Sequence, residues 1–362
     1  MVLCSLIDFQ MSKLIDLSIK AAVLTAINKP LEIKNLTLQK LLPGQVLIKI
    51  LYSGICRSQL MEVEGKRGQD NWLPHLLGHE ASGIVMEIGP EVTKVKQGDE
   101  VILSWIKSSG IEAPGAIYHD NELVINSGAV TTFSNYSVVS ENRLVKKPKD
   151  IPFHTAILLG CALPTGAGMI QNQLNISTDS SVAVIGLGGI GLSAILMLIA
   201  KKVKNIIAID ISEEKLAQVR SWGVLEAMNS SQVNIKERIH SLGFKNGVDF
   251  CIESAGAVQT IEQGFSLIRN NGGELLFASH PPDGEKISLA PHELISGKKI
   301  SGSWGGGTEP DSDFPVLSRI LMASPVSLDS LLSKEYSLND INIAISDLSE
   351  GKVFRPLIKM EH

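Results

Sequence analysis

Two different patterns of apolar and polar positions divide the chain near residue 165. Before it, short apolar runs bounded by Gly, Pro or Asp predict β-strands, as in GQVLIKILYSG (44–54), ASGIVMEIG (81–89) and GDEVILSW (98–105). After it, apolar strands alternate with helical stretches, which predicts a parallel sheet covered on both faces. We therefore expect an α/β protein that joins a small barrel of strands to a doubly wound sheet.

The second pattern begins with a strand, a glycine turn and a helix in SVAVIGLGGIGLSAILMLIA (181–200), followed by the strand NIIAID (205–210). Further strands are predicted within 247–256, 272–280 and 298–304, and helices over 258–272 and 314–324.

Composition narrows the class of protein. The chain has 362 residues, 44% of them hydrophobic and 20% charged, which fits roughly two globular domains. The net charge of −5 and the lack of a Lys/Arg run disfavour a nucleic-acid partner. No apolar stretch reaches the ~18 residues that span a bilayer, and the N-terminus lacks a basic signal-peptide region. We expect a cytoplasmic protein with no membrane partner.

The glycine turn has the spacing of a dinucleotide-binding fingerprint, with Gly186, Gly188 and Gly191 between a strand and a helix. The three glycines would permit a tight turn, close approach of a pyrophosphate and close packing of the helix. Asp210 ends the next strand and can accept hydrogen bonds from ribose hydroxyls, while its charge would repel a 2′-phosphate. The pattern favours NAD over NADP; the alternative is a glycine turn without a ligand.

Cysteine and histidine provide a second candidate site. Four cysteines are too few and too scattered for a disulfide framework. Cys56, His79 and Cys161 would suit Zn²⁺ as two thiolates and one imidazole, with a fourth position open. Their spacing alone does not decide, because buried thiols and hydrogen-bonded core histidines are common.

The motifs taken together carry a resemblance to a known family. They occur in order as GICRSQL, GHEASG, GDEVI, TFSNYSVV, GCALPTG, GLGGIG, AIDIS, LISGKKISGS and a tail with FRP. The chain resembles the zinc-dependent alcohol dehydrogenases of the medium-chain dehydrogenase/reductase superfamily from about residue 19 to 362. The resemblance implies a GroES-like β-barrel catalytic domain (1–163 and 305–362) and a Rossmann NAD-binding domain with a doubly wound parallel sheet (164–304).

By this resemblance, Cys56, His79 and Cys161 are ligands of one catalytic zinc. Glu80 is the acid beside the metal, and Ser58 hydrogen-bonds the substrate alcohol and relays its proton. The implied reaction is reversible oxidation of an alcohol to an aldehyde or ketone, with hydride transfer to NAD.

The resemblance also assigns cofactor and pocket residues. Trp105 shapes the substrate pocket, and His280 lies where the chain passes the nicotinamide, either turned to solvent or in contact with a polar substrate. The residues expected to bind NAD are Arg57, Thr165, Gly186, Gly188, Gly189, Gly191, Asp210, Lys215 and Arg355.

Three departures from the family pattern stand out. The lobe after GDEVI contains no cysteine, so it cannot hold the four-cysteine structural zinc of many relatives. Met61 replaces a relay histidine and cannot carry a proton. Gln59 replaces an acid that supports a ligand histidine; glutamine can accept the imidazole N–H but supplies no charge, which predicts a more electropositive zinc and weaker metal retention.

Other functions remain open at this level. One alternative is a related carbonyl or activated double-bond reductase in which zinc is not central, and another is a non-catalytic nucleotide-binding protein. For partners, we expect a small-molecule alcohol or carbonyl substrate and a homodimer or homotetramer, the dimer joined edge to edge through KKISGSW (298–304). The complete ligand set and Ser58 favour the alcohol dehydrogenase.

Overall fold

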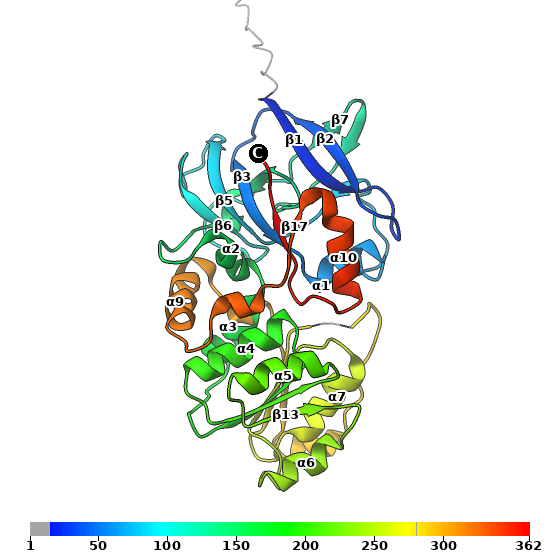
Figure 1. The fold of residues 1–362 in the computed structure, drawn as a ribbon, viewed down its shortest axis with the longest axis vertical. Coiled ribbons are helices and arrows are strands. Elements are labelled where there is room, and N and C mark those ends of the chain that lie inside the picture. Colours follow the sequence, from blue (N-terminus) through cyan, green and yellow to red (C-terminus); the bar gives the residue numbers. More distant parts are fainter. Residues whose placement is uncertain (1–14, 280) are drawn as a thin grey trace, which may run out of the picture.

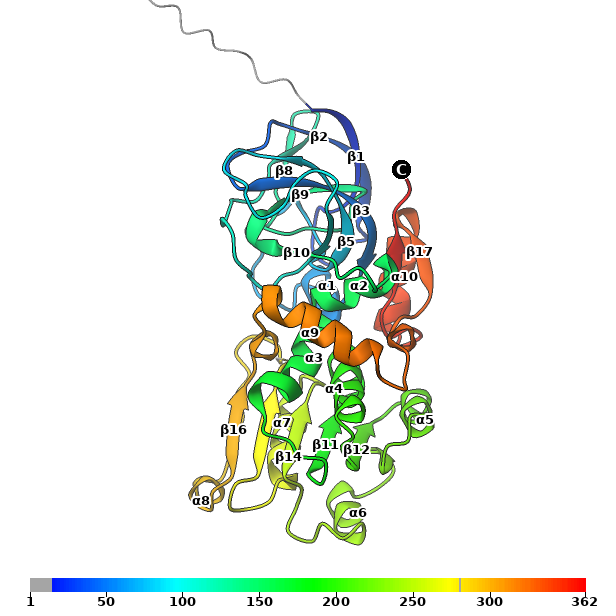
Figure 2. The ribbon, with the colours of Figure 1, turned by 90° about the vertical axis from the view of Figure 1, so that its left-hand side faces the viewer.

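The computed structural model describes residues 15–279 and 281–362. It has two lobes stacked along its long axis (Figure 1). The upper lobe contains the N-terminal strands and the C-terminal end of the chain, and the lower lobe contains the parallel sheet. Helices α3 (Ala162–Gly168) and α9 (Pro310–Met322) lie where the lobes meet (Figure 2).

The upper lobe is built from two mainly antiparallel sheets. A five-stranded sheet has the order β4-β1-β2-β7-β8, and a seven-stranded sheet has the order β10-β6-β5-β3-β18-β17, with β9 also pairing with β3. The long strand β3 pairs with β5, β9 and β18, so the C-terminal strand β18 belongs to the same sheet as β3, β5 and β9. The strands are β1 (Ile15–Leu24), β2 (Glu32–Leu38), β3 (Gln45–Gly54), β4 (His75–Leu76), β5 (Ala81–Ile88), β6 (Glu100–Leu103), β7 (Tyr118–Asp120), β8 (Leu123–Ile125), β9 (Tyr136–Ser140), β10 (Leu144–Lys146), β17 (Glu335–Ser337) and β18 (Leu357–Lys359).

The lower lobe holds a six-stranded sheet of order β13-β12-β11-β14-β15-β16, in which every pair is parallel. Successive residues of β11 face opposite sides: Val182 and Val184 join one apolar cluster, and Ala183 and Ile185 join the other. This alternation buries both faces of the sheet. The strands are β11 (Ser181–Ile185), β12 (Asn205–Asp210), β13 (Glu226–Asn229), β14 (Phe250–Glu253), β15 (Glu274–Phe277) and β16 (Lys299–Gly302).

The strand order reverses direction between β11 and β14, and ligands of open α/β sheets bind at such a switch point. The glycine turn follows β11 there. Besides α3 and α9, the helices are α1 (Arg57–Val63), α2 (Phe153–Ala156), α4 (Gly189–Ala200), α5 (Glu213–Ser221), α6 (Ile235–Ser241), α7 (Val258–Leu267), α8 (Pro291–Ile295) and α10 (Ile341–Ser349).

The expected fold class, a barrel-like lobe plus a doubly wound parallel sheet, is confirmed. The six parallel strands fall inside 164–304, while the domain boundaries themselves remain a prediction. Two helix ends differ from expectation. Helix α7 ends at Leu267 because Ile268 turns extended and bridges to Val248. Helix α9 begins before Phe314, because Pro310 has the fixed φ that suits a first helical position.

The length and apolar character of the helices show whether any of them could span a membrane. Within the described residues, no single helix is long and apolar enough to cross a bilayer; only the bent pair Phe153–Gly160 and Ala162–Gln173, with 57° between its two parts, has the combined length and composition.

Candidate metal and cofactor site

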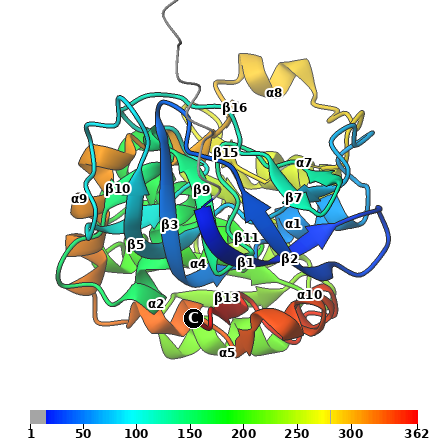
Figure 3. The same ribbon diagram turned by 90° about the horizontal axis from the view of Figure 1, so that it is seen from above.

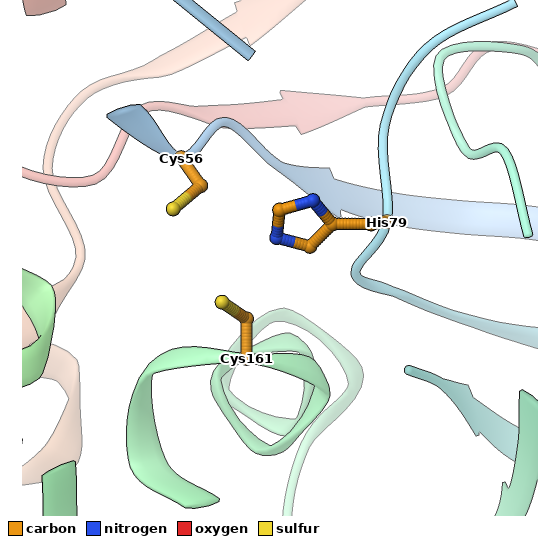
Figure 4. Close-up of side chains that lie close together, drawn as sticks. All are labelled: Cys56, His79 and Cys161. Atoms are coloured by element: carbon orange, nitrogen blue, oxygen red, sulfur yellow. The ribbon is translucent and has the colours of Figure 1, made fainter. Parts of the chain in front are cut away.

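The three predicted metal ligands meet between the lobes. Cys56 follows β3 and precedes α1, His79 lies between β4 and β5, and Cys161 immediately precedes α3. Their ligand atoms all lie within 4.8 Å of one another (Figure 4). A tetrahedral zinc with Zn–S bonds of about 2.3 Å needs ligand atoms about 3.8 Å apart. The cluster is therefore close to the size that such an ion requires.

The polar atoms of this cluster fit a metal ion. His79 Nε2 is buried and has no hydrogen-bond partner among the described residues, and its ring points toward the two sulfur atoms (Figure 4). A hydrogen bond from Cys161 and the charge of Arg355 hold the pKa of the Cys56 thiol well below its ordinary value, despite burial. The hydrogen bond with Cys56, together with burial, raises the pKa of Cys161. Two thiol groups and a buried imidazole nitrogen that faces them are the donor types of a zinc site.

Gln59 supports two of these ligands from the first turn of α1. Its Oε1 accepts a hydrogen bond from the backbone N–H of Cys56 at 2.9 Å, and its Nε2 contacts His79 Nδ1. The side chain is buried. Gln59 thus links the loop before α1 to the imidazole ring, using both ends of its amide.

Glu80 and Arg355 form a buried ion pair behind the metal ligands. Glu80 Oε2 accepts a hydrogen bond from Arg355 Nη2, and both side chains are almost completely excluded from solvent. Although burial opposes it, the charge of Glu80 raises the pKa of Arg355 further above its ordinary value. The sequence placed Glu80 at the metal and Arg355 at the cofactor, but it did not anticipate that the two would pair.

The residues that follow Cys56 face different surroundings. Arg57 is exposed at the start of α1, whereas Ser58 Oγ is buried without a hydrogen-bond partner among the described residues. Met61 lines a cavity of about 410 Å³ that is open to solvent. The other residues around this cavity are Lys66, Arg67, Pro281, Pro282, Asp283, Gly284 and Glu285.

The glycine turn has the geometry of a phosphate-binding loop. Gly186 has φ of 85°, and a Cβ on Gly191 would lie 1.9 Å from the carbonyl oxygen of Gly186, so neither position accepts a side chain without distortion. A Cβ on Gly188 would meet nothing within 4 Å, which leaves that side of the turn open. Helix α4 starts at Gly189, so its free N–H groups and positive dipole end point toward this open side.

Asp210, at the carboxyl end of β12, is tied to the same turn. Its Oδ2 accepts a hydrogen bond from the backbone N–H of Leu187 at 2.6 Å, and Lys215 Nζ lies 3.9 Å from the same oxygen. The acid, the lysine and the glycine turn therefore lie together, and their binding of the adenosine ribose stays a prediction.

Arg355 lies between the metal cluster and the glycine turn, and Thr165 contacts the metal cluster at Cys161. A Cβ built on Gly189 would lie 2.9 Å from Arg355 Nη1, so the guanidinium that pairs with Glu80 also reaches the start of α4. Thr165 Oγ1 donates to the carbonyl oxygen of Cys161 at 2.8 Å. The predicted metal ligands thus lie next to the predicted cofactor residues Thr165, Gly189 and Arg355.

Of the predicted pocket residues, Trp105 packs edge-on against Trp304, with ring centroids 5.0 Å apart. Trp304, which the sequence did not single out, is 79% exposed. His280 lies outside the described residues.

Carboxylate side chains stabilise the cysteine-free segment that follows GDEVI. Glu141 accepts backbone hydrogen bonds from Thr93, Lys94 and Ile111, each at 2.7 Å. Asp311 at the start of α9 accepts from Ser109 and pairs with Lys94. The sequence predicted only ordinary packing here; it carries no local signal for Glu141, because the N–H groups converge from segments far apart in the chain.

Comparisons with known proteins agree with this geometry. The alcohol dehydrogenase GroES-like domain family matches residues 42–149, and the zinc-binding dehydrogenase family matches residues 189–322. S-(hydroxymethyl)glutathione dehydrogenase of Escherichia coli (strain SMS-3-5 / SECEC) is 30% identical over 368 residues, which cover 94% of this chain and 99% of that protein.

Solved structures give the same picture over nearly the full length. An alcohol dehydrogenase zinc-binding domain protein from Burkholderia ambifaria superposes with a TM-score of 0.86 at 27% identity, covering 96% of this chain and 100% of that one. Benzyl alcohol dehydrogenase from Acinetobacter calcoaceticus superposes with a TM-score of 0.85 at 29% identity, covering 95% and 100%.

Proposed function

The chain belongs to the zinc-dependent alcohol dehydrogenase family, and from this premise we propose that Cys56, His79 and Cys161 hold its one catalytic zinc ion. The protein is an NAD-dependent enzyme that interconverts a small-molecule alcohol and its aldehyde or ketone. The observation that supports the metal site most strongly is the buried Nε2 of His79, which faces two cysteine sulfurs and has no hydrogen-bond partner within 15–279 and 281–362.

A zinc ion at this position would act as a Lewis acid that lowers the pKa of the substrate hydroxyl. We assign the proton transfer to Ser58, whose buried Oγ lacks a partner among the described residues and which lies two residues from Cys56. In the oxidation direction Ser58 would accept the hydroxyl proton while its own proton leaves toward solvent, because Met61 cannot carry one. NAD bound beside this site would supply the acceptor for the hydride of the substrate carbon.

For NAD, the open side of Gly188 and the start of α4 would receive the pyrophosphate, with Arg57 and Arg355 adding positive charge. Asp210 and Lys215 would hold the adenosine ribose, and Thr165 would line the nicotinamide. Asp210 would repel a 2′-phosphate, and Ile211 and Ser212, which follow it, supply no arginine to receive one. Trp105 would form one wall of the substrate pocket.

We also propose a homodimer formed through β16. This strand ends its sheet, and its outward N–H and C=O groups form an edge available to a second strand. Helix α8 lies on the same side of the molecule (Figure 3), and its Ile295 is 81% exposed. Ile295→Asp should convert the dimer to a monomer in light scattering; an unchanged mass would contradict this interface.

The test of the proposed function combines metal content with turnover. The purified protein should contain one zinc per chain and reduce NAD⁺ with at least one member of a panel of primary, secondary and aryl alcohols. Cys161→Ser should lose both zinc and activity. Zinc without turnover on any alcohol or aldehyde would support a non-catalytic role, and full turnover of Cys161→Ser would support a reductase that does not depend on zinc.

A further inference from the structure

The side-chain amide of Gln59 presents its oxygen to Cys56 and its NH₂ group to His79, and both of these residues belong to the metal site. Its oxygen accepts from the backbone N–H of Cys56 at 2.9 Å, and its NH₂ group contacts His79 Nδ1. With only 2% of the residue exposed, solvent has little access to replace either contact. An amide has one accepting end and one donating end, so this arrangement is satisfied only when Nδ1 of His79 is an acceptor.

Metal binding would change what His79 presents to Gln59. Nε2 is the ring nitrogen that faces the sulfurs, and a neutral imidazole that binds a metal through Nε2 carries its hydrogen on Nδ1. The Nδ1–H would then face the NH₂ group of Gln59, donor against donor. Turning the amide over would satisfy His79, but it would set the NH₂ group against the N–H of Cys56. In either orientation one buried donor loses its acceptor.

A carboxylate at residue 59 would not meet this conflict, because each of its two oxygens accepts hydrogen bonds. It could bind the Cys56 N–H and the His79 Nδ1–H together. Zinc binding would therefore add a matched hydrogen bond in a carboxylate variant, whereas it breaks one in this chain. Losing such support for a metal-bound histidine costs roughly ten- to a hundredfold in metal affinity.

We propose that Gln59 is a positioning residue that holds His79 in its metal-free tautomer and thereby sets a low zinc affinity. The proposal rests on the zinc site proposed above. It makes metal loading of this protein responsive to the supply of zinc, since an ion held less tightly is exchanged more readily. The chain's own hydrogen-bonding pattern stabilises the metal-free state, in which Gln59 satisfies both of its neighbours.

Two measurements on the full-length protein test this proposal. In the metal-free wild type, ¹⁵N NMR of histidine should find the hydrogen of His79 on Nε2; in metal-free Gln59→Glu it should move to Nδ1. Competition with a chromophoric chelator should give Gln59→Glu, and independently Gln59→Asp, a zinc dissociation constant ten- to a hundredfold lower. Gln69→Glu adds the same charge at an exposed position of the following loop and should change the zinc affinity by less than twofold.

The proposal is overturned if wild-type His79 already carries its hydrogen on Nδ1 without metal. It is also overturned if both carboxylate variants bind one zinc no more tightly than wild type, or if Gln69→Glu tightens binding equally. Failure of the zinc site itself would look different, because neither the wild type nor Cys161→Ser would bind stoichiometric zinc. The tautomer of His79 in the wild type is measured without metal. It therefore tests the role of Gln59 whether or not the protein binds zinc.

Discussion

Glu80 and Arg355 form an ion pair that is almost wholly excluded from solvent, although they lie 275 residues apart in the chain. Glu80 lies next to the metal ligand His79, and Arg355 lies next to Gly189 of the glycine turn. The pair therefore connects the two halves of the proposed active site. Since a buried charge without its partner is costly, we expect the two residues to be strongly coupled energetically.

The first prediction concerns this coupling. Arg355→Met leaves the carboxylate of Glu80 buried and unpaired, which should lower the free energy of unfolding by about 3 kcal/mol. In the Glu80→Gln background the same substitution should cost much less. Urea unfolding of the metal-free and NAD-free protein measures both. Arg319→Met, on the exposed side of α9, is the control, and equal losses in the two backgrounds would contradict the coupling.

The second prediction concerns the cysteine-free segment that follows GDEVI. In Glu141→Gln an NH₂ group replaces one of the oxygens that accept N–H groups from Thr93, Lys94 and Ile111. Leaving a buried donor unpaired should destabilise the protein by about 1–3 kcal/mol. Thermal or urea unfolding measures the loss, and Glu122→Gln on an exposed turn should have no effect. If the two variants are equally stable, the carboxylate does not organise the lobe.

The third prediction is a dependence of stability on pH that arises from the same residue. Burial raises the pKa of Glu141, but the three backbone N–H groups outweigh it and hold the pKa below 4.5 in the folded protein. The folded-state pKa is thus lower than the unfolded one, so the stabilisation is complete above about pH 5 and is lost as the pH falls through the folded-state value. Unfolding free energies should converge for wild type and Glu141→Gln as the pH falls from 5 toward 3. Parallel curves would contradict this.

The fourth prediction concerns cofactor choice. Asp210→Asn keeps an acceptor for the Leu187 N–H but removes the charge that would repel a 2′-phosphate. We expect the ratio of kcat/KM for NAD to that for NADP to fall by about tenfold. Asp179→Asn, at an exposed ion pair with Lys204, should leave the ratio unchanged. An undiminished preference for NAD in Asp210→Asn would show that another group excludes the phosphate.

Much of the fold could be predicted from local sequence patterns. The strand, glycine turn and helix of 181–200 could be located because each depends on contacts between near neighbours, and Gly186 and Gly191 occupy positions where a Cβ would clash. The end of α7 could not be located in this way. Ile268 leaves the helix to bridge Val248, a contact between segments that are distant in sequence.

The sequence by itself determined the residue types. These are two cysteines, a histidine and a serine suited to metal-assisted proton transfer, an acid at the end of the second strand of the fingerprint, and a segment after GDEVI without cysteine. Only the tertiary structure decided how they are connected. It paired Glu80 with Arg355, gave Glu141 three backbone donors and set the two ends of Gln59 against Cys56 and His79. The physical reason is that a hydrogen bond or ion pair depends on position and direction in space, and Glu80 and Arg355 meet only once β18 has paired with β3.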